Sequence, residues 1–255
     1  MHVIATTAGL VGIAEMNRPP NNFFDKSLIR SLAEAFEGFE AQGMRAILLC
    51  SRGKNFCAGA DFSNPASETV GSVHDGMDDH LYTYAAQLFR CRLPIVAAVQ
   101  GAAVGGGLGV AMVADFRVAS PESRFAANFT RLGFHPGFGL SVSLPRVIGG
   151  QQAAKLFYTG RRITGDEAHR INLADVLVPA VDLRNAAIEL AQEIAASAPI
   201  AVQSVRATLR GSLAADIVAA TRHELAQQEI QFQTEDFAEG IEAMAARRLP
   251  QFVGR

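Results

Sequence analysis

With 255 residues, of which 49% are hydrophobic and 19% charged, the chain is long enough to bury a large core and too apolar to be disordered. Its net charge of −2 gives no bulk attraction for nucleic acid or an anionic membrane, and no apolar run reaches membrane-spanning length. Cys50, Cys57 and Cys91 are odd in number and match no zinc spacing, which predicts reduced thiols. Met1 leads directly into a strand-like pattern, so we expect a cytoplasmic protein.

The first half of the chain alternates between strand and helix patterns. Residues 2–6 and 10–15 flank an Ala-Gly turn and predict an antiparallel hairpin. Apolar residues at helical spacing predict a helix over residues 26–42. The same criteria predict strands at 46–50, 94–99 and 116–119 and a helix at 80–91. Such alternation is typical of a mainly parallel sheet with crossover connections.

The second half is predominantly helical. Thr164 and Glu167 have the spacing of a capping box and predict the start of a short helix. From residue 182 onward the pattern is helical, with breaks at residues 198–199 and 211–212.

A run of three glycines, Gly105 to Gly107, follows the apolar strand at residues 94–99. It opens a segment, 108–114, that carries almost no polar side chain, which predicts a buried helix. Without Cβ atoms the backbone can lie against a ligand and present its N–H groups at the start of a helix. A tight turn that packs closely and binds nothing explains the composition equally well.

A second turn of small residues, 56–62, follows the strand at residues 46–50. Its sequence is Phe-Cys-Ala-Gly-Ala-Asp-Phe, and it too can expose backbone amides. If the two turns face each other, they supply two N–H donors to one oxygen, which is the geometry of an oxyanion hole. The sequence leaves open whether they do.

Residues 56–62 resemble a signature of the crotonase family, which includes enoyl-CoA hydratases and isomerases. Residues 94–115 resemble the second signature of that family, and further likeness extends from residues 16–22 to 247–252. The resemblance implies an α/β fold with a crotonase-like spiral core of ββα units and a small C-terminal helical domain. We therefore expect a core over residues 1–198 and a helical trimerisation region over residues 199–255.

The resemblance also implies a substrate and a site. The family binds an acyl-CoA thioester with its carbonyl oxygen between two backbone amides, which fall on Ala60 and Gly106 here. Coenzyme A is part of the substrate, so no separate cofactor and no metal is expected, and the subunits are expected to form a homotrimer or a dimer of trimers. The other positions implied to contact the substrate are Ala58, Asp61, Phe62, Gly105, Gly109 and Phe129.

The chain departs from the hydratases of this family at the residues that transfer protons. The two glutamates of those hydratases fall on Gly109 and Phe129, and a further carboxylate position falls near Gly137. Because none of the three carries an acid, we expect enoyl-CoA hydration to be weak. His135 has the titration range for a substitute acid or base, although a histidine hydrogen-bonded within a loop is more common.

Two functions follow from these observations. The chain is either an enzyme that acts on an acyl-CoA through an enolate, such as an isomerase, decarboxylase, hydrolase or unusual hydratase, or a non-catalytic acyl-CoA-binding protein. Dinucleotide binding is disfavoured because the glycines miss the G-x-G-x-x-G spacing.

Overall fold

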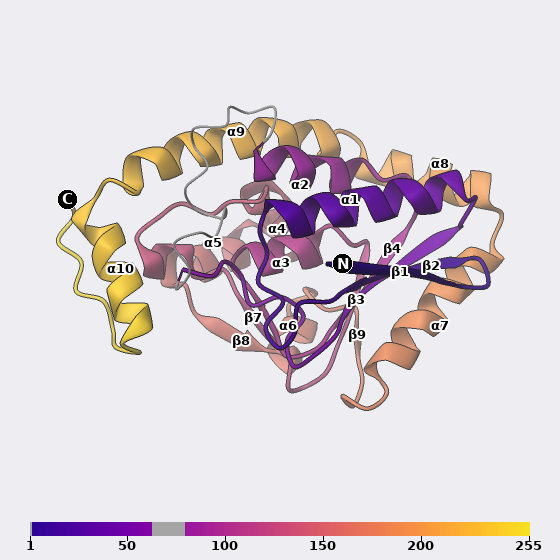
Figure 1. The fold of residues 1–255 in the computed structure, drawn as a ribbon, viewed down its shortest axis with the longest axis horizontal. Helices are drawn as coiled ribbons and strands as arrows, with labels where there is room; N and C mark the ends of the chain where they lie inside the picture. The colour runs from indigo at the N-terminus through magenta and orange to yellow at the C-terminus, as the bar shows by residue number, and fades with distance from the viewer. Residues whose placement is uncertain (1, 63–79) are drawn as a thin grey trace.

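The computed structural model describes residues 2–62 and 80–255, which form two sheets flanked by helices (Figure 1). Within that part of the chain the larger sheet has six strands in the order β1-β2-β3-β4-β6-β9, and the smaller has three in the order β5-β7-β8. The strands are β1 (Val3–Ala8), β2 (Val11–Met16), β3 (Ala46–Ser51), β4 (Ile95–Val99), β5 (Ala102–Val104), β6 (Phe116–Ala119), β7 (Arg124–Ala126), β8 (Arg162–Thr164) and β9 (Val176–Leu177).

The larger sheet is mainly parallel, as the alternating pattern predicts. Strands β1 and β2 form the expected antiparallel hairpin, and the pairs from β2 to β9 are all parallel. Helical crossovers connect the parallel strands, as this topology requires. The helices of the described part are α1 (Lys26–Ala41), α2 (Leu81–Arg90), α3 (Gly106–Met112), α4 (Leu140–Ile148), α5 (Gly150–Thr159), α6 (Gly165–Arg170), α7 (Leu183–Ala196), α8 (Pro199–Arg210), α9 (Leu213–Gln231) and α10 (Glu235–Ala245), with a 3₁₀ helix η3 (Asn128–Leu132).

Strand β3 shows why the larger sheet is buried on both faces. Successive side chains point to opposite sides of a strand, so Leu48 packs in the cluster covered by α7, whereas Ile47 and Leu49 pack in the cluster that includes α1 and α2. Helices α1 and α7 accordingly lie on opposite sides of the sheet in Figure 1. The continuous apolar run of β3 is therefore typical of a strand with two covered faces.

Helices α8 and α9 pack against the core, although they follow the break at residues 197–198. Asp115 lies between α3 and β6. It accepts hydrogen bonds from Nε of Arg206 (2.8 Å) and of Arg210 (2.9 Å) on α8. Helix α9 packs against α2 and α4 through a seam that contains the buried polar residues Glu224 and Gln228. The last helices therefore help to build the interior of the protein.

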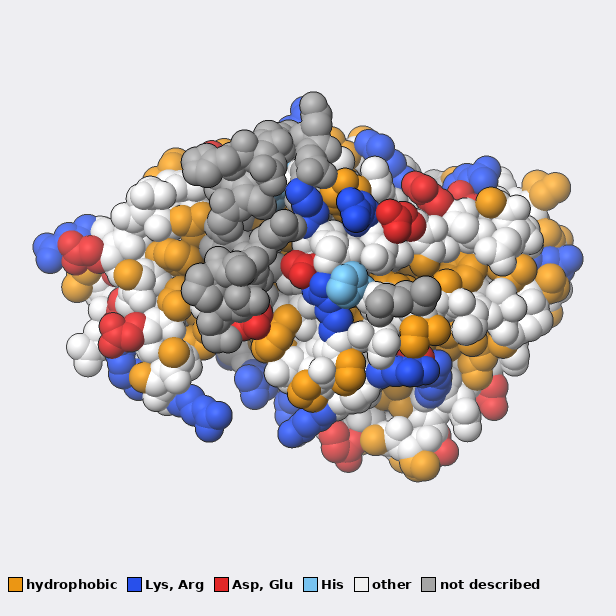
Figure 2. Space-filling view, viewed as in Figure 1, with side chains coloured by type: hydrophobic (Ala, Val, Ile, Leu, Met, Phe, Trp, Pro, Cys, Tyr) orange, Lys and Arg blue, Asp and Glu red, His pale blue; other side chains and the backbone are white. Residues whose placement is uncertain are grey.

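The surface carries charges of both signs. On the face drawn in Figure 2, basic and acidic side chains are interspersed, in keeping with the small net charge of −2. None of the helices within residues 2–62 and 80–255 is both long and apolar enough to cross a bilayer.

Candidate functional site

The two small-residue turns lie side by side because the chain at Cys57 pairs with β5. The Cys57 amide donates to the Ala102 carbonyl (2.9 Å), and the Val104 amide donates to the Cys57 carbonyl (3.1 Å). This parallel bridge makes the two segments run in the same direction. Ala60 follows Cys57 on one segment, and Gly106 follows β5 on the other. Because the paired segments run in the same direction, Ala60 and Gly106 lie next to each other.

Glycines permit this close approach. A Cβ atom at Gly59 would lie 2.9 Å from the Val104 carbonyl oxygen, and the φ of Gly59 is +94°, which disfavours other residues. A Cβ atom at Gly107 would collide with the Cys57 carbonyl oxygen. Gly59 and Gly107 are thus required by the contact between the two turns.

Ala60 and Gly106 line one cavity of about 540 Å³. Neither amide donates a backbone hydrogen bond to another residue of the described part of the chain. Gly106 is the first residue of α3, where N–H groups have no partner within the helix. Both amides are therefore available as donors beside the same space.

The cavity is apolar at its buried end and charged at its exposed end. Buried or half-buried rings and aliphatic groups form the inner part, and Ala58 and Gly105 lie beside the two amides. Lys54, Glu122 and Arg162 are exposed and line the outer part. The inner lining comprises Phe24, Phe62, Leu81, Phe129, Leu132, Phe134 and Phe232.

Tyr82 and Gln228 place polar groups in the inner part, and half-buried Asn128 is a further polar lining residue beside Gly105. The Tyr82 hydroxyl donates to Oε1 of Gln228 (2.8 Å) and is also hydrogen-bonded to the backbone of Phe138. Burial raises the pKa of Tyr82 well above its usual value, so the hydroxyl keeps its proton at neutral pH. The sequence does not single out Tyr82 and Gln228, because they come from α2 and α9 and meet only in the folded protein.

The same two side chains occupy the space beside Gly137. A Cβ atom at Gly137 would collide with the Tyr82 hydroxyl and lie 2.7 Å from Nε2 of Gln228. The family's further carboxylate position falls near Gly137. In this chain, a phenol and an amide fill the volume that a side chain there would need.

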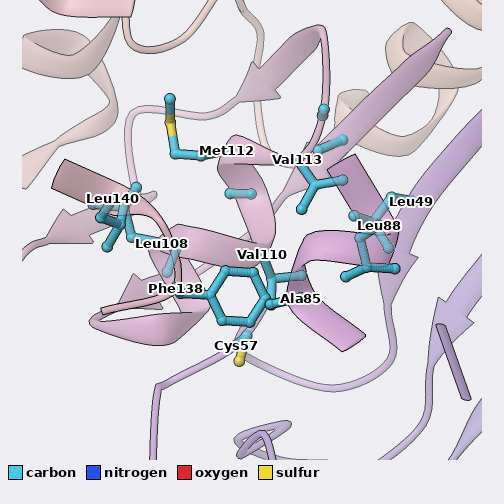
Figure 3. Close-up of a cluster of buried hydrophobic side chains, with 14 of the residues drawn as sticks. Leu49, Cys57, Ala85, Leu88, Leu108, Val110, Met112, Val113, Phe138 and Leu140 are labelled. Carbon is cyan, nitrogen blue, oxygen red and sulfur yellow. The ribbon is translucent and has the colours of Figure 1, made fainter. Parts of the chain in front are cut away.

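Gly109 is covered by Phe138 and does not line the cavity. A Cβ atom at Gly109 would lie 2.7 Å from both Cβ and the ring of Phe138, which is 1% exposed. Figure 3 shows the Phe138 ring beside Val110, which belongs to α3 as Gly109 does. The expected substrate contact at Gly109 is therefore replaced by a packing contact, and the space of a glutamate there is filled.

His135 and Asp61 also lie outside this cavity. His135 lines a second cavity, where its backbone N–H donates to Oε1 of Gln231 (2.6 Å) and its ring packs against His223 at a centroid distance of 5.7 Å. Asp61 follows Ala60 directly but is not among the lining residues. The structure thus brings Ala60, Gly106 and most of the predicted contact residues together without the predicted acid or base.

Acidic side chains are scarce in this cavity. Glu122 is the only carboxylate among its described lining residues, and it is exposed at the outer end. No histidine belongs to that lining, and the described residues contain no cluster of three potential metal ligands. The arrangement is suited to polarising an oxygen with backbone amides, and the lining that residues 2–62 and 80–255 provide contains no pair of carboxylates for moving protons.

Comparison with known proteins agrees with this architecture. A profile of the enoyl-CoA hydratase/isomerase family matches residues 6–255. A putative enoyl-CoA hydratase/isomerase of Bacillus subtilis is 32% identical over 247 residues, which is 96% of this chain and 95% of the relative. A short-chain-enoyl-CoA hydratase of Clostridium acetobutylicum is 32% identical over 251 residues, covering 97% of this chain and 95% of that protein.

Solved structures show the same fold. The crystal structure of an enoyl-CoA hydratase/isomerase from Pseudoalteromonas atlantica superposes with a TM-score of 0.88 at 27% identity and covers 99% of this chain and 100% of its own. The expected crotonase-like fold is confirmed by this match. With the profile matching nearly every residue and relatives that are 32% identical over 95% of their own length, the chain belongs to the enoyl-CoA hydratase/isomerase family.

Proposed function

We propose that this protein is an enzyme that binds a coenzyme A thioester with its carbonyl oxygen between the amides of Ala60 and Gly106 and stabilises an enolate there. The observation that carries the proposal is the pairing of Cys57 with β5, because it brings both amides to one cavity. Preorganised backbone donors act on the charge that develops on such an oxygen during the reaction.

The two ends of the cavity suit the two ends of this substrate. The aromatic inner part offers apolar surface to an acyl group, and its rings contribute both burial and edge-to-face contacts. Lys54, Arg124 and Arg162 line the outer part, where cationic side chains favour the phosphates of coenzyme A. Glu122 lies among them and limits the net positive charge of this end.

The lining favours reactions that need little proton abstraction. Hydration, named for the Clostridium acetobutylicum relative, uses carboxylates in this family, and the positions of both glutamates are occupied by Gly109 and Phe129. Decarboxylation of a malonyl-type thioester requires no base. The bond to the carboxylate carbon breaks, carbon dioxide leaves, and the electron pair passes to the thioester oxygen held by the amides. The α-carbon then takes a proton; we assign its donor as the Tyr82 hydroxyl, which lines the cavity, and the phenolate left behind regains a proton from solvent through the exposed end.

Exchange of Ala60 for proline tests the proposal, because proline has no amide hydrogen. Proline keeps the Cβ atom of alanine, so no side-chain contact of the native residue is lost. Wild type is first incubated with malonyl-, enoyl- and saturated acyl-CoA thioesters, and the products are identified by mass spectrometry. We expect Ala60→Pro to lower the turnover of the converted thioester by roughly 10²- to 10³-fold. Ala60→Ser keeps the N–H, so the difference between the two variants measures the loss of the amide hydrogen together with the constraint of the proline ring.

Gly106 is less suitable for the test. A Cβ atom at Gly106 would collide with the ring of Phe24, so any substitution there disturbs the cavity wall as well as the amide.

Equal turnover of Ala60→Pro and Ala60→Ser would contradict the proposed function.

Non-catalytic binding of an acyl-CoA is the second candidate function. It is favoured by one observation, which is that the described lining beside the two amides contains neither a carboxylate nor an imidazole. In that case the wild-type protein binds coenzyme A thioesters saturably and converts none of the panel.

A further inference from the structure

A second cavity lies directly behind the aromatic end of the first. It has a volume of about 500 Å³. Phe134 is the residue that belongs to the lining of both cavities. The ring of Phe134, which is buried, therefore forms a partition between them.

Neighbouring aromatic rings pack around the Phe134 side chain. The Phe134 ring packs edge-to-face against Phe129 and Phe237, at centroid distances of 5.4 and 5.8 Å, and against Phe232 at 5.3 Å. A phenylalanine side chain makes no hydrogen bond that rotation would break. The ring can exchange one set of aromatic neighbours for another without leaving a polar group unpaired.

The second cavity is mostly apolar and reaches the surface. Its walls from α4 and α5 include Pro145, Ala153, Ala154 and Phe157. Tyr158 also lines it and is 81% exposed, so the cavity opens to solvent on that side. Such a lining offers burial to a hydrocarbon chain whose far end reaches the surface.

We propose that the second cavity binds the distal part of a long, unbranched acyl chain, which passes Phe134 when that ring turns aside. The inference rests on the proposed function, since the chain enters from the thioester held at Ala60 and Gly106. It names the substrate class of that site as long-chain acyl-CoA, with Phe134 and the α5 wall setting the preference for chain length.

Calorimetric titration with butyryl-CoA and dodecanoyl-CoA tests this, and the measured quantity is the ratio of the two Kd values. Wild type is expected to bind dodecanoyl-CoA more tightly, because each buried methylene adds favourable transfer free energy. Ala154→Phe fills the second cavity from α5 and is expected to raise the ratio of dodecanoyl-CoA Kd to butyryl-CoA Kd by roughly tenfold, which corresponds to about two methylenes losing their burial.

Two further variants keep the result interpretable. Ala196→Phe, at the exposed end of α7 and outside both linings, makes the same exchange elsewhere and is expected to leave the ratio at the wild-type value. Phe134→Ala removes the partition and is expected to lower the ratio. Circular dichroism spectra of all variants establish that each is folded.

The outcomes separate this inference from the proposed function. An unchanged ratio in Ala154→Phe, or tighter binding of butyryl-CoA than of dodecanoyl-CoA by wild type, overturns the long-chain inference and leaves the proposed function standing. Failure of wild type to bind either thioester overturns the proposed function, and the inference with it.

Discussion

Phe138 occupies the place where a side chain at Gly109 would begin, and this competition is measurable as a coupling free energy. In Gly109→Ala the new methyl lies 2.7 Å from Cβ and the ring of Phe138, so the ring or the helix must move. Overpacking of this kind costs about 1–3 kcal/mol. Alanine within a helix is favoured over glycine by roughly 0.5–1 kcal/mol. The single variant is therefore expected to lose up to about 2 kcal/mol of unfolding free energy.

The partner variant is Phe138→Gly, because alanine would keep the Cβ atom that lies closest to Gly109. Loss of the buried ring costs roughly 3–5 kcal/mol, and relief of the left-handed backbone, with a φ of +64°, returns about 1–2 kcal/mol. In this background Gly109→Ala meets no ring, so only its helix preference remains. The double-mutant cycle cancels that preference and leaves a coupling of about 1–3 kcal/mol.

Urea unfolding of wild type, both single variants and the double variant, followed by circular dichroism, gives the four free energies. A coupling below about 0.5 kcal/mol is what independent sites show. That result would refute the argument that Phe138 fills the space of a catalytic side chain at Gly109.

Three further predictions concern the cavity wall and its supports. Tyr82→Phe deprives buried Gln228 of its donor and is expected to lower the unfolding free energy by about 1–3 kcal/mol; unchanged urea unfolding would contradict this. Burial raises the pKa of Glu224 above 4.5, so the folded state keeps a proton that the unfolded state loses. Stability should therefore decline as pH rises above 4.5, and a Tm series should show no such decline in Glu224→Gln, whereas parallel curves would argue against it. Asp115→Asn leaves Arg206 uncompensated and should cost roughly 3–5 kcal/mol in urea unfolding, and a loss below about 1 kcal/mol would contradict this.

Five of the six strands of the larger sheet could be predicted from the sequence, whereas the two-residue strand β9 and the smaller sheet could not. Strand β3 is a continuous apolar run, and its two covered faces make that run necessary. Strands β5, β7 and β8 have three residues each, which is too short to show a period. The pairing of Cys57 with β5, on which the site depends, belongs to this unpredicted sheet region.

The candidate site was predictable in the two turns that carry its backbone amides and in two of its rings, Phe62 and Phe129, but not in the rest of its lining. The family signatures place Ala60 and Gly106 in glycine-rich turns, and the structure brings those turns together. Which side chains fill the surrounding space depends on contacts between distant segments, such as Phe138 against Gly109. His135 has suitable chemistry, but the loop that carries it directs it to the second cavity.

The seam along α9 determines when the first cavity can close during synthesis. The first cavity takes lining residues from Phe24 near the start of the chain to Gln228, Phe232 and Met244 close to its end. A nascent chain on the ribosome therefore cannot enclose a ligand until α9 and α10 have emerged. Until then the ring of Phe134 lacks two of its aromatic neighbours, Phe232 and Phe237.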